Sequence, residues 1–360
     1  MRATLILSDG TVFRGKGLGY EGKAYGELVF CTSMSGYEEA LTDPSYKGQI
    51  LIFTYPLIGN YGCYTTELES DRIQVEALVV REASKEPSHH AMKRSLHEFL
   101  YDHRVPAIEG IDTRALTVKL REEGVMPAII QVSEEEVDVS DLLSELKDMP
   151  PYGKLDLVSQ VTRGDVKLID VKGKRTVALI DCGVKRSIIR SLVKRGLNVL
   201  LFPAYTSSME IRSYDPDGVV FSNGPGDPSE LRPVIECARD LIEEVPILGI
   251  CLGHQVLALA MGGRTYKLKF GHRGVNHPVK DLETGRIFIT SQNHGYSVDP
   301  QSLDGTGFIV TQISLNDGSV EGIAHKELPV MSTQYHPEGH LGPRDNERVF
   351  DEFMRKVESY

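Results

Sequence analysis

The sequence lacks the marks of a membrane protein, a nucleic-acid-binding protein and a disulfide-stabilised protein. No uncharged apolar run is long enough to cross a bilayer, and the N-terminal apolar run is too short for a signal peptide. The formal net charge is -11, whereas binding to phosphate backbones needs an excess of Lys and Arg. The five cysteines form no C-x-x-C pair, so neither a disulfide framework nor a zinc site is indicated. We expect a cytoplasmic protein with reduced thiols.

Two patterns that suggest a bound nucleotide or metal are also incomplete. The glycines of residues 15–19 lack the last glycine and the helix of a dinucleotide-binding loop, and no G-x-x-x-x-G-K-[ST] motif occurs. His336 and His340 have the spacing of a zinc-binding helix, but a proline and a glycine lie between them and oppose a helix. We therefore expect no metal and no cofactor in this chain.

The second half of the chain alternates between strands and helices. The 360 residues, 41% of them hydrophobic and 25% charged, suffice for two domains of ordinary size. Apolar periodicity predicts strands at 177–180, 198–202, 218–221 and 247–250, and helices at 186–195, 230–244 and 252–261. Later strands (286–290, 308–312, 320–325, 330–334) extend or flank the sheet, and a helix at 346–358 closes it. This rhythm predicts an α/β domain with a doubly wound, mostly parallel sheet.

The first half mixes strands, turns and helices. Strands are predicted at 3–7, 11–13, 28–32, 49–54 and 73–80, and helices at 88–101 and 112–123. An acidic run, a Pro-Pro pair and alternating charge mark 133–174 as a connector with one helix, 139–147. We therefore expect a smaller mixed β/α domain at 1–132, the connector at 133–174 and the α/β domain at 175–360.

The most informative single residue is Cys251. Residues 249–253 read Gly-Ile-Cys-Leu-Gly, between a short apolar strand and a helix, which is the spacing of a nucleophile elbow with sulfur in place of the serine oxygen. Glycines on both sides let the strand and the helix approach closely around a strained turn. A thiol at the start of a helix meets the positive end of the helix dipole, which favours the thiolate. Isolated cysteines are more often packing residues, and we read Cys31, Cys182 and Cys237 in that way.

A nucleophilic cysteine needs a base and a group that orients the base. His336 follows the last predicted apolar strand, and Pro337 disfavours a helix there. In an extended segment His336 and Glu338 face the same side, so the carboxylate can fix the tautomer of the imidazole. His-Pro-Glu alone is more often a surface turn, and it gains weight only from the elbow.

The segment 222–228, Ser-Asn-Gly-Pro-Gly-Asp-Pro, follows another predicted strand. Two glycines around a proline make a loop whose backbone can approach a ligand closely. Backbone N–H groups of this loop, together with that of Leu252, are candidates for binding an oxyanion. Alone, such a segment is most often only a loop.

Together, segments 222–228, 249–255 and 335–338 resemble, in this order, the motifs of class I (triad) glutamine amidotransferases. Segments 30–50, 54–62 and 112–117 are similar to the small subunits of carbamoyl phosphate synthetases, so the resemblance covers nearly the whole chain. It implies that Cys251 attacks the carboxamide of L-glutamine, that His336 transfers protons and that Glu338 orients His336.

The resemblance also implies a set of residues that line the glutamine site. They are Ser45, Gly224, Gly226, Leu252, Gln255, Asn293, Gly295 and Tyr296. Gln255 lies one helical turn beyond Cys251, so it can reach a ligand near the sulfur. Tyr296 stands where many relatives carry phenylalanine, which leaves a side-chain role at this position open.

The resemblance further implies a partner. The family delivers ammonia through a tunnel to a large synthetase subunit, which makes carbamoyl phosphate from bicarbonate and ATP for arginine and pyrimidine synthesis. ATP and a divalent metal are then expected only in that subunit, and the assembly is a heterodimer or a higher oligomer.

Two alternatives stay open at this stage. The first is that the chain serves another amidotransferase as its glutaminase, although those relatives lack the segment 42–49. The second is a non-catalytic interaction subunit that keeps the elbow as a scaffold, although the cysteine, histidine and glutamate are all present.

Overall fold

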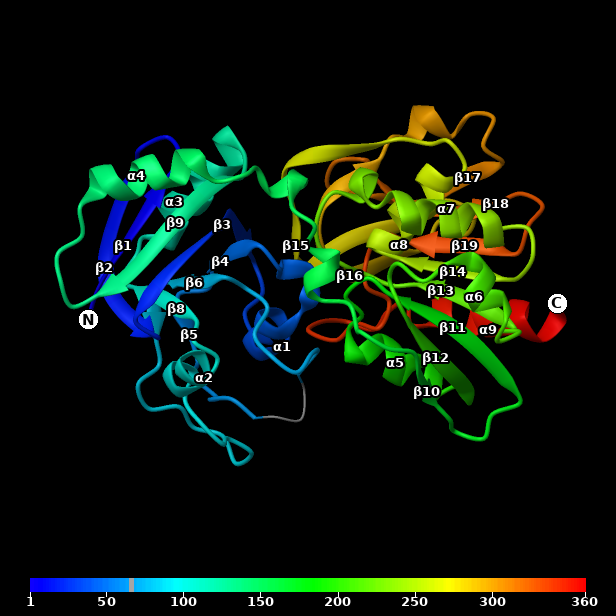
Figure 1. The fold of residues 1–360 in the computed structure, drawn as a ribbon, viewed down its shortest axis with the longest axis horizontal. Coiled ribbons are helices and arrows are strands. Elements are labelled where there is room, and N and C mark those ends of the chain that lie inside the picture. Colours follow the sequence, from blue (N-terminus) through cyan, green and yellow to red (C-terminus); the bar gives the residue numbers. More distant parts are fainter. Residues whose placement is uncertain (65–67) are drawn as a thin grey trace. The chain divides into compact units, whose positions relative to one another are not determined.

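The computed structural model describes residues 1–64 and 68–360. Their contacts divide into two compact units, Met1–Leu155 and Asp156–Tyr360, and Figure 1 shows the elements of each. The segment 133–174, which the sequence suggested as a connector, is shared between the two units.

The first unit is built on a closed barrel of seven strands in the order β1-β2-β8-β6-β4-β3-β9. Its strands are β1 (Arg2–Leu7), β2 (Val12–Gly19), β3 (Gly22–Cys31), β4 (Gln49–Phe53), β6 (Ala77–Val80), β8 (Pro106–Glu109) and β9 (Met126–Ser133). The neighbours β3, β4, β6 and β8 pair in parallel, and the other pairs are antiparallel. Closure leaves the barrel without a free strand edge. The short strands β5 (Leu57–Ile58) and β7 (Glu82–Ala83) form a separate parallel pair.

The described residues of the first unit also form the α-helices α1 (Tyr37–Thr42), α2 (Leu96–Asp102), α3 (Thr113–Glu123) and α4 (Val139–Asp148). The predictions for α3 and α4 are confirmed within one residue at each end. Leu142 and Leu146 of α4 pack against Ile6 of β1 and Ile129 of β9. This buried apolar contact makes α4 part of the first unit rather than a free connector helix.

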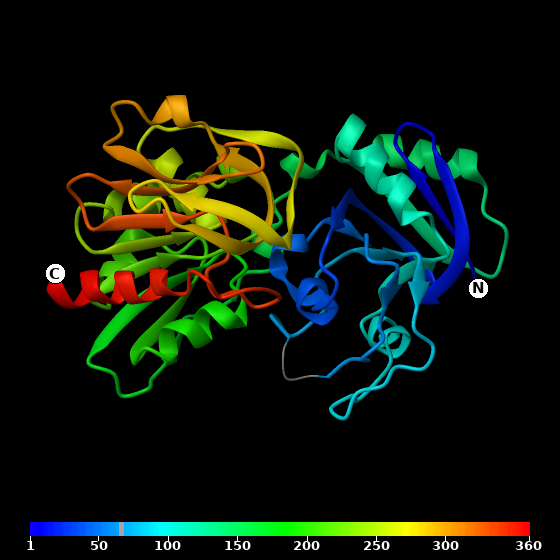
Figure 2. The ribbon, with the colours of Figure 1, turned by 180° about the vertical axis from the view of Figure 1, so that it is seen from behind.

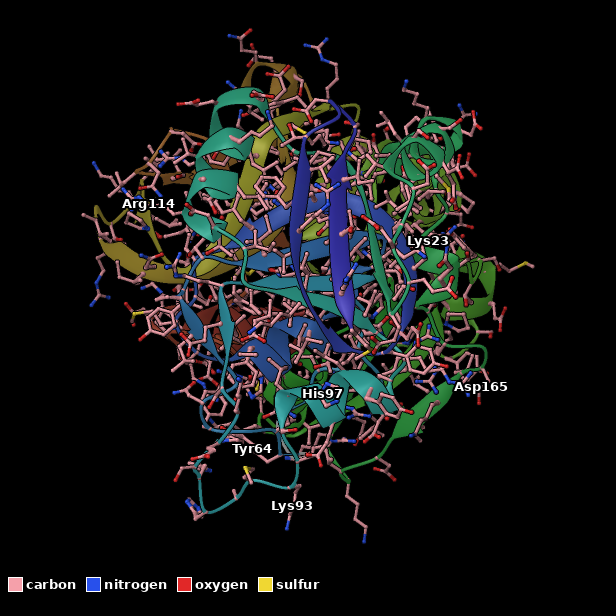
Figure 3. All side chains as sticks on the ribbon, turned by 90° about the vertical axis from the view of Figure 1, so that its left-hand side faces the viewer. Lys23, Tyr64, Lys93, His97, Arg114 and Asp165 are labelled. Atoms are coloured by element: carbon pink, nitrogen blue, oxygen red, sulfur yellow. The ribbon has the colours of Figure 1, made fainter. Side chains whose placement is uncertain are left out.

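The helix predicted at 88–101 is wrong in its first half. Helix α2 begins only at Leu96, because Ser95 and Glu98 form a capping box that satisfies the first backbone N–H groups. His97, labelled in Figure 3, accepts a hydrogen bond from the backbone N–H of Gly19 through Nδ1, at 3.0 Å. This bond ties α2 to the end of β2.

The second unit contains a ten-stranded sheet in the order β10-β12-β11-β13-β14-β19-β18-β17-β15-β16. Its strands are β10 (Lys167–Ile169), β11 (Arg175–Asp181), β12 (Leu197–Pro203), β13 (Gly218–Phe221), β14 (Ile247–Ile250), β15 (Thr265–Asp281), β16 (Ile287–Val298), β17 (Phe308–Ser314), β18 (Val320–His325) and β19 (Val330–Thr333). The strands from β12 to β19 in this order pair in parallel and form the centre. Antiparallel strands extend the sheet on both sides, so the predicted α/β fold with a parallel core is confirmed.

Helices cover both faces of this sheet, as Figures 1 and 2 show. They are α5 (Arg186–Val193), α6 (Ser208–Arg212), α7 (Arg232–Leu241), α8 (Leu252–Ala260) and α9 (Arg348–Ser359). Alternate residues of the central strands face opposite cores. Ala178 and Ile180 pack in the core under α6, α7 and α8, whereas Val177 and Leu179 pack under α5 and α9. Two buried faces explain why these strands read as continuous apolar runs.

The sequence did not predict β15, a strand of 17 residues. It contains charged residues, glycines and histidines rather than an apolar run, and its pairing with β16 shifts register twice. The polar residues are accommodated because this long hairpin, yellow in Figure 2, forms the end of the sheet. Within residues 1–64 and 68–360, no helix has both the length and the apolar character needed to span a bilayer.

Candidate active site

Cys251 occupies the sharp turn between β14 and α8. Its backbone has φ 55 and ψ -101, which for a residue with a side chain costs on the order of 1–3 kcal/mol. The turn is held because Cys251 N donates a hydrogen bond of 2.8 Å to Thr333 O of β19. A Cβ at Gly253 would lie 2.1 Å from Phe221 O, and one at Gly249 would lie 2.7 Å from Gly253 O. The predicted elbow therefore forms, and both glycines are needed for the strand and helix to approach each other.

His336 and Glu338 follow β19 and lie side by side in the interior. His336 Nδ1 is 2.7 Å from Glu338 Oε1, and both residues are almost fully buried. The segment is anchored by His336 N, which donates to Ser291 O of β16 at 2.9 Å. His336 Nε2 is buried and has no hydrogen-bond partner among the residues that the structure describes. The ring therefore presents one nitrogen to the carboxylate and leaves the other for a reacting group.

The charges around His336 keep its imidazole protonated. Burial lowers the pKa of His336. The charge of Glu338 and its hydrogen bond to Nδ1 oppose this effect, and the nearby thiol of Cys251 adds to the rise, so the pKa is raised to about 10. This interaction also means that the thiol of Cys251 lies within reach of the ring. The geometry thus brings together the three residues predicted to be catalytic.

Sequence reasoning missed Lys185, which lies in the loop after β11. Its Nζ donates to Glu338 Oε1 at 3.0 Å and to His340 O at 3.3 Å, and its side chain is 4% exposed. Burial raises the pKa of Glu338, but Lys185 and His336 outweigh burial and hold that pKa far below its usual range. Glu338 therefore stays ionised in the interior. The available signal was position, because the loop follows the carboxyl end of a central parallel strand, where ligand sites form.

The loop that follows β13 packs against the elbow. Ser222 O accepts a hydrogen bond of 3.0 Å from Gly253 N. A Cβ at Gly224 would lie 2.2 Å from Cys182 O and 2.7 Å from Leu252 Cδ2, so only glycine fits there. Gly226 has φ 92, in the region that favours glycine. The structure thus brings Gly224 and Leu252 together beside Cys251.

Strand β16 lies on another side of Cys251. Cys251 Sγ lies 3.6 Å from Asn293 O. Gln255 Nε2 donates to Tyr296 O at 2.9 Å and to Gln334 Oε1 at 3.0 Å. Both hydrogens of this amide are therefore used within the protein, and only Gln255 Oε1 remains available to a ligand.

Ser45 is the one predicted site residue that lies in the first unit. It belongs to a 3-10 helix, Pro44–Tyr46, and its N–H donates to Asp43 Oδ1 at 2.9 Å. The remaining predicted residues all lie in the second unit, at or near the carboxyl ends of β13, β14 and β19 or on β16.

Other candidates for nucleophile and base are unsuited to these roles. Burial raises the pKa of the Cys63, Cys182 and Cys237 thiols, which keeps them protonated. His254 lies one turn beyond Cys251, but burial lowers its pKa to about 3, and its Nδ1 is bonded to Ser332 Oγ at 2.9 Å. His254 is therefore a neutral residue of the interior.

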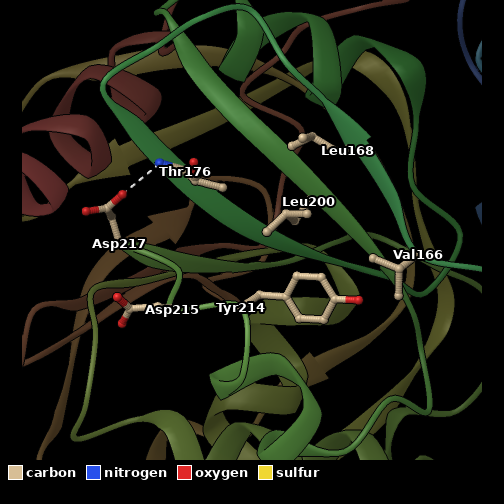
Figure 4. Close-up of a pocket in the computed structure, with 7 residues that line it drawn as sticks. All are labelled: Val166, Leu168, Thr176, Leu200, Tyr214, Asp215 and Asp217. Carbon is tan, nitrogen blue, oxygen red and sulfur yellow. Dashed lines mark hydrogen bonds between the residues drawn. The ribbon is translucent and has the colours of Figure 1, made fainter.

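A separate surface pocket of the second unit is shown in Figure 4. Thr176, Leu200 and Tyr214 are among the residues that line it, and Asp217 Oδ2 accepts a hydrogen bond of 2.7 Å from Thr176 N. Thr176 lies near the start of β11, so the pocket is at the amino end of the parallel strands, whereas Cys251 is at the carboxyl end. Its lining contains no thiol and no imidazole.

The sequence matches two family models. Residues 178–356 match the glutamine amidotransferase class-I family, and residues 5–130 match the CPSase domain of the carbamoyl-phosphate synthase small chain. The carbamoyl phosphate synthase small chain of Methanopyrus kandleri is 52% identical over 357 residues, which is 98% of each chain. That of Archaeoglobus fulgidus is 50% identical over 360 residues, the full length of both chains. That of Staphylococcus epidermidis is 46% identical over 357 residues, 99% of this chain and 96% of the relative. The chain therefore belongs to the family of carbamoyl phosphate synthase small chains, with a class I glutamine amidotransferase domain in its second half.

Proposed function

We propose that this chain is the glutaminase subunit of a glutamine-dependent carbamoyl phosphate synthetase, and that Cys251, His336 and Glu338 perform the hydrolysis. Relatives named carbamoyl phosphate synthase small chain match over nearly the whole chain, which supports the assignment to this synthetase. One observation carries the assignment of the three catalytic residues. His336 is bonded to Glu338 through Nδ1, and its buried Nε2 has no partner within the described residues, next to a cysteine on a strained elbow.

The first half-reaction forms a thioester. Cys251 Sγ, as thiolate, attacks the side-chain carbonyl carbon of L-glutamine, and the carbonyl electrons move onto oxygen. His336 then gives its Nε2 proton to the amide nitrogen as the C–N bond breaks, and ammonia leaves. A γ-glutamyl thioester on Cys251 and a neutral His336 remain.

The second half-reaction restores the enzyme. His336 Nε2 takes a proton from a water molecule while the water oxygen attacks the thioester carbon. The C–S bond breaks and the thiolate–imidazolium pair returns. The new γ-carboxyl group releases its proton to solvent, and glutamate leaves. Glu338 stays ionised throughout and holds the ring, in the way that a carboxylate orients the base of a serine triad.

Backbone donors stabilise the oxyanion in both steps. We assign this role to the N–H groups of Leu252, at the first position of α8, and of the loop that contains Gly224. Loss of one such donor costs roughly 3–4 kcal/mol of transition-state stabilisation. Gln255 Oε1, the free acceptor of that amide, contacts an N–H group of the substrate. Asn293, Gly295, Tyr296 and Gly226 of the second unit complete the proposed glutamine site.

Use of the ammonia requires a second chain. By the family resemblance, carbamoyl phosphate synthesis from bicarbonate and ATP takes place on a large synthetase subunit, which also binds the divalent metal. The two subunits form at least a heterodimer in the cytoplasm, and the product serves arginine and pyrimidine biosynthesis.

The test is a pair of cysteine substitutions in the full chain. Cys251→Ser abolishes glutamine hydrolysis but leaves ammonia-dependent synthesis intact when the large subunit is present. Cys237→Ser, in a buried packing position of α7, retains glutaminase activity. Mass spectrometry of the wild type with glutamine finds the γ-glutamyl adduct on Cys251. Full glutaminase activity in Cys251→Ser would exclude the mechanism, and no hydrolysis by the wild type with its partner would favour a non-catalytic subunit.

A further inference from the structure

A second cluster of buried polar groups lies among β15, β16 and β18. His272, His294 and Glu321 each offer one ligand atom, and these atoms lie within 4.8 Å of one another. All three residues are buried. Glu321 Oε1 is 3.5 Å from His272 Nδ1. Gln292 Oε1 is 3.2 Å from His272 Nδ1 and 2.7 Å from His294 Nε2. Nitrogen and oxygen atoms from three strands thus face a common point.

The outer nitrogen of each imidazole faces an acceptor. His272 Nε2 is 2.8 Å from Asp317 Oδ2, and His294 Nδ1 is 2.7 Å from the backbone oxygen of Tyr296. Because these oxygens accept hydrogen bonds, each outer nitrogen carries a hydrogen, and in its neutral form each ring turns a lone pair inward. A carboxylate or carbonyl behind the ring is also the usual second contact of a metal-bound histidine.

The inward lone pairs meet other acceptors. The lone pair of His294 Nε2 faces Gln292 Oε1. In the structure, Gln292 Nε2 lies 3.0 Å from Glu321 Oε2 and donates to it. If the oxygen and nitrogen of the Gln292 amide were exchanged, the amide oxygen would face this carboxylate instead, so the exchange only moves the conflict. Two additions relieve the conflict. One is a further proton on His272, because burial lowers the pKa of this histidine but the Asp317 and Glu321 carboxylates outweigh burial and raise the pKa to about 9. The other is a cation at the common point, which satisfies all these acceptors. A divalent ion also balances the charges of Asp317 and Glu321 while both rings remain neutral.

We propose that His272, His294 and Glu321 bind a divalent transition-metal ion of the zinc type. Gln292 Oε1 or a water molecule is the remaining ligand. Two imidazoles with one carboxylate suit Zn²⁺ or Co²⁺, whereas Mg²⁺ and Ca²⁺ prefer oxygen ligands alone. The ion would tie three strands together and brace the part of β16 around Asn293. Its role is structural, and it takes no part in bond breaking.

The site departs from the expectation of a metal-free chain. That expectation rested on cysteine spacing and on the pair His336 and His340. The residues proposed here are more than twenty positions apart in sequence, so no local spacing reveals them.

The test counts bound metal in the full-length chain. The Cys251→Ser variant is used throughout, since it removes a competing thiolate. After treatment with chelator and exchange into micromolar Zn²⁺, we expect one bound equivalent by elemental mass spectrometry and a higher Tm than without metal. Co²⁺ in its place gives visible absorption bands of a site with nitrogen and oxygen ligands.

Three variants in the same background localise the ion. Glu321→Gln, which has nearly the same shape, loses the bound equivalent. Asp317 lies on a partly exposed turn, and an asparagine keeps the acceptor oxygen that Ser319 uses. We therefore expect Asp317→Asn to fold and to weaken metal binding by roughly 10–100-fold through the lost carboxylate behind His272. His325→Asn, on β18 but outside the cluster, keeps the metal. No bound equivalent in the parent, or binding that Glu321→Gln and Asp317→Asn leave unchanged, overturns the proposal.

Discussion

At the scale of single residues, the site contains a buried carboxylate, Glu338, between two cationic side chains, Lys185 and His336. Lys185, Glu338 and His336 are joined by contacts of 3.0 and 2.7 Å, and the open nitrogen of His336 is directed to Cys251. Removing charges from water is costly, so each buried charge needs its neighbour. The lysine matters because it permits an ionised carboxylate behind the imidazole even when the imidazole becomes neutral during the reaction.

Replacement of Lys185 tests this dependence. Lys185→Met leaves Glu338 with one cationic partner, and breaking such a buried pair costs about 3–5 kcal/mol of unfolding free energy. We also expect a lower kcat for glutamine hydrolysis, because Glu338 then holds a proton more readily and orients His336 less well. Denaturant unfolding and steady-state kinetics measure the two effects. The matched control is Lys194→Met, whose side chain is 68% exposed in an ion pair with Glu347 and which costs no more than ~1 kcal/mol.

Two buried histidines predict opposite pH effects on stability. The pKa of His336 is raised from 6.5 to about 10, so its contribution is fully present below pH 6.5 and is lost as the pH rises towards 10. The pKa of His254 is lowered from 6.5 to about 3, so its contribution is lost as the pH falls below 6.5. The stability difference between wild type and His336→Asn should therefore shrink with rising pH. The difference for His254→Asn should shrink with falling pH. Urea unfolding across this range measures both, and equal slopes would contradict the assignment of charges.

At the scale of elements, the elbow depends on the close contact of β13, β14 and α8. A Cβ at Gly253 would meet the backbone oxygen of Phe221 at 2.1 Å, and backbone atoms cannot turn aside as a side-chain end can. We expect Gly253→Ala to cost about 1–3 kcal/mol or more by overpacking and to abolish glutaminase activity, because α8 moves away and displaces Leu252. Unfolding curves and hydrolysis assays check this. Gly164→Ala, in open space in the same unit, is the control. An active and stable Gly253→Ala would show that the turn tolerates a wider spacing.

Sequence periodicity predicted the elements with two buried faces and missed those with mixed surroundings. Strands β13 and β14 lie at the predicted residues, because a strand buried on both sides must be apolar throughout. Strand β15 was missed since its buried residues include the polar side chains of His272 and Arg273, which give no apolar run. Closure of the first-unit barrel could not be predicted either, since it depends on pairing between β2 and β8, far apart in sequence.

The same distinction applies to the site. Cys251 could be identified from its own neighbours, because the glycines of the elbow are local. Lys185 could not, because its partner Glu338 is 153 positions away and only the fold brings them together. Long-range polar contacts of this kind leave no periodic pattern in a single sequence.

At the scale of the whole molecule, the chain consists of two units with separate cores. The first unit includes residues that sequence composition assigned to a connector. Leu142 and Leu146 of α4 pack on Ile6 and Ile129 of the barrel. The segment 133–155 is polar on average, but these few apolar residues lie on one side of α4 and attach it to the barrel. The boundary between the units at Leu155 then follows from packing rather than from composition.

Replacement of Leu146 in α4 by alanine tests whether the two cores unfold separately. Leu146→Ala removes a side chain that is 3% exposed, which costs about 2–5 kcal/mol in the unit that contains it. We expect faster hydrogen exchange in peptides from β1 and β9, on which α4 packs, and unchanged exchange in β11 and β14 of the second unit. Val118→Ala on α3, at a side chain that is 43% exposed, serves as the control and leaves both sets unchanged. Equal acceleration in both units would mean that they unfold as one cooperative body, whereas no acceleration in β1 and β9 would show that α4 adds nothing to the barrel.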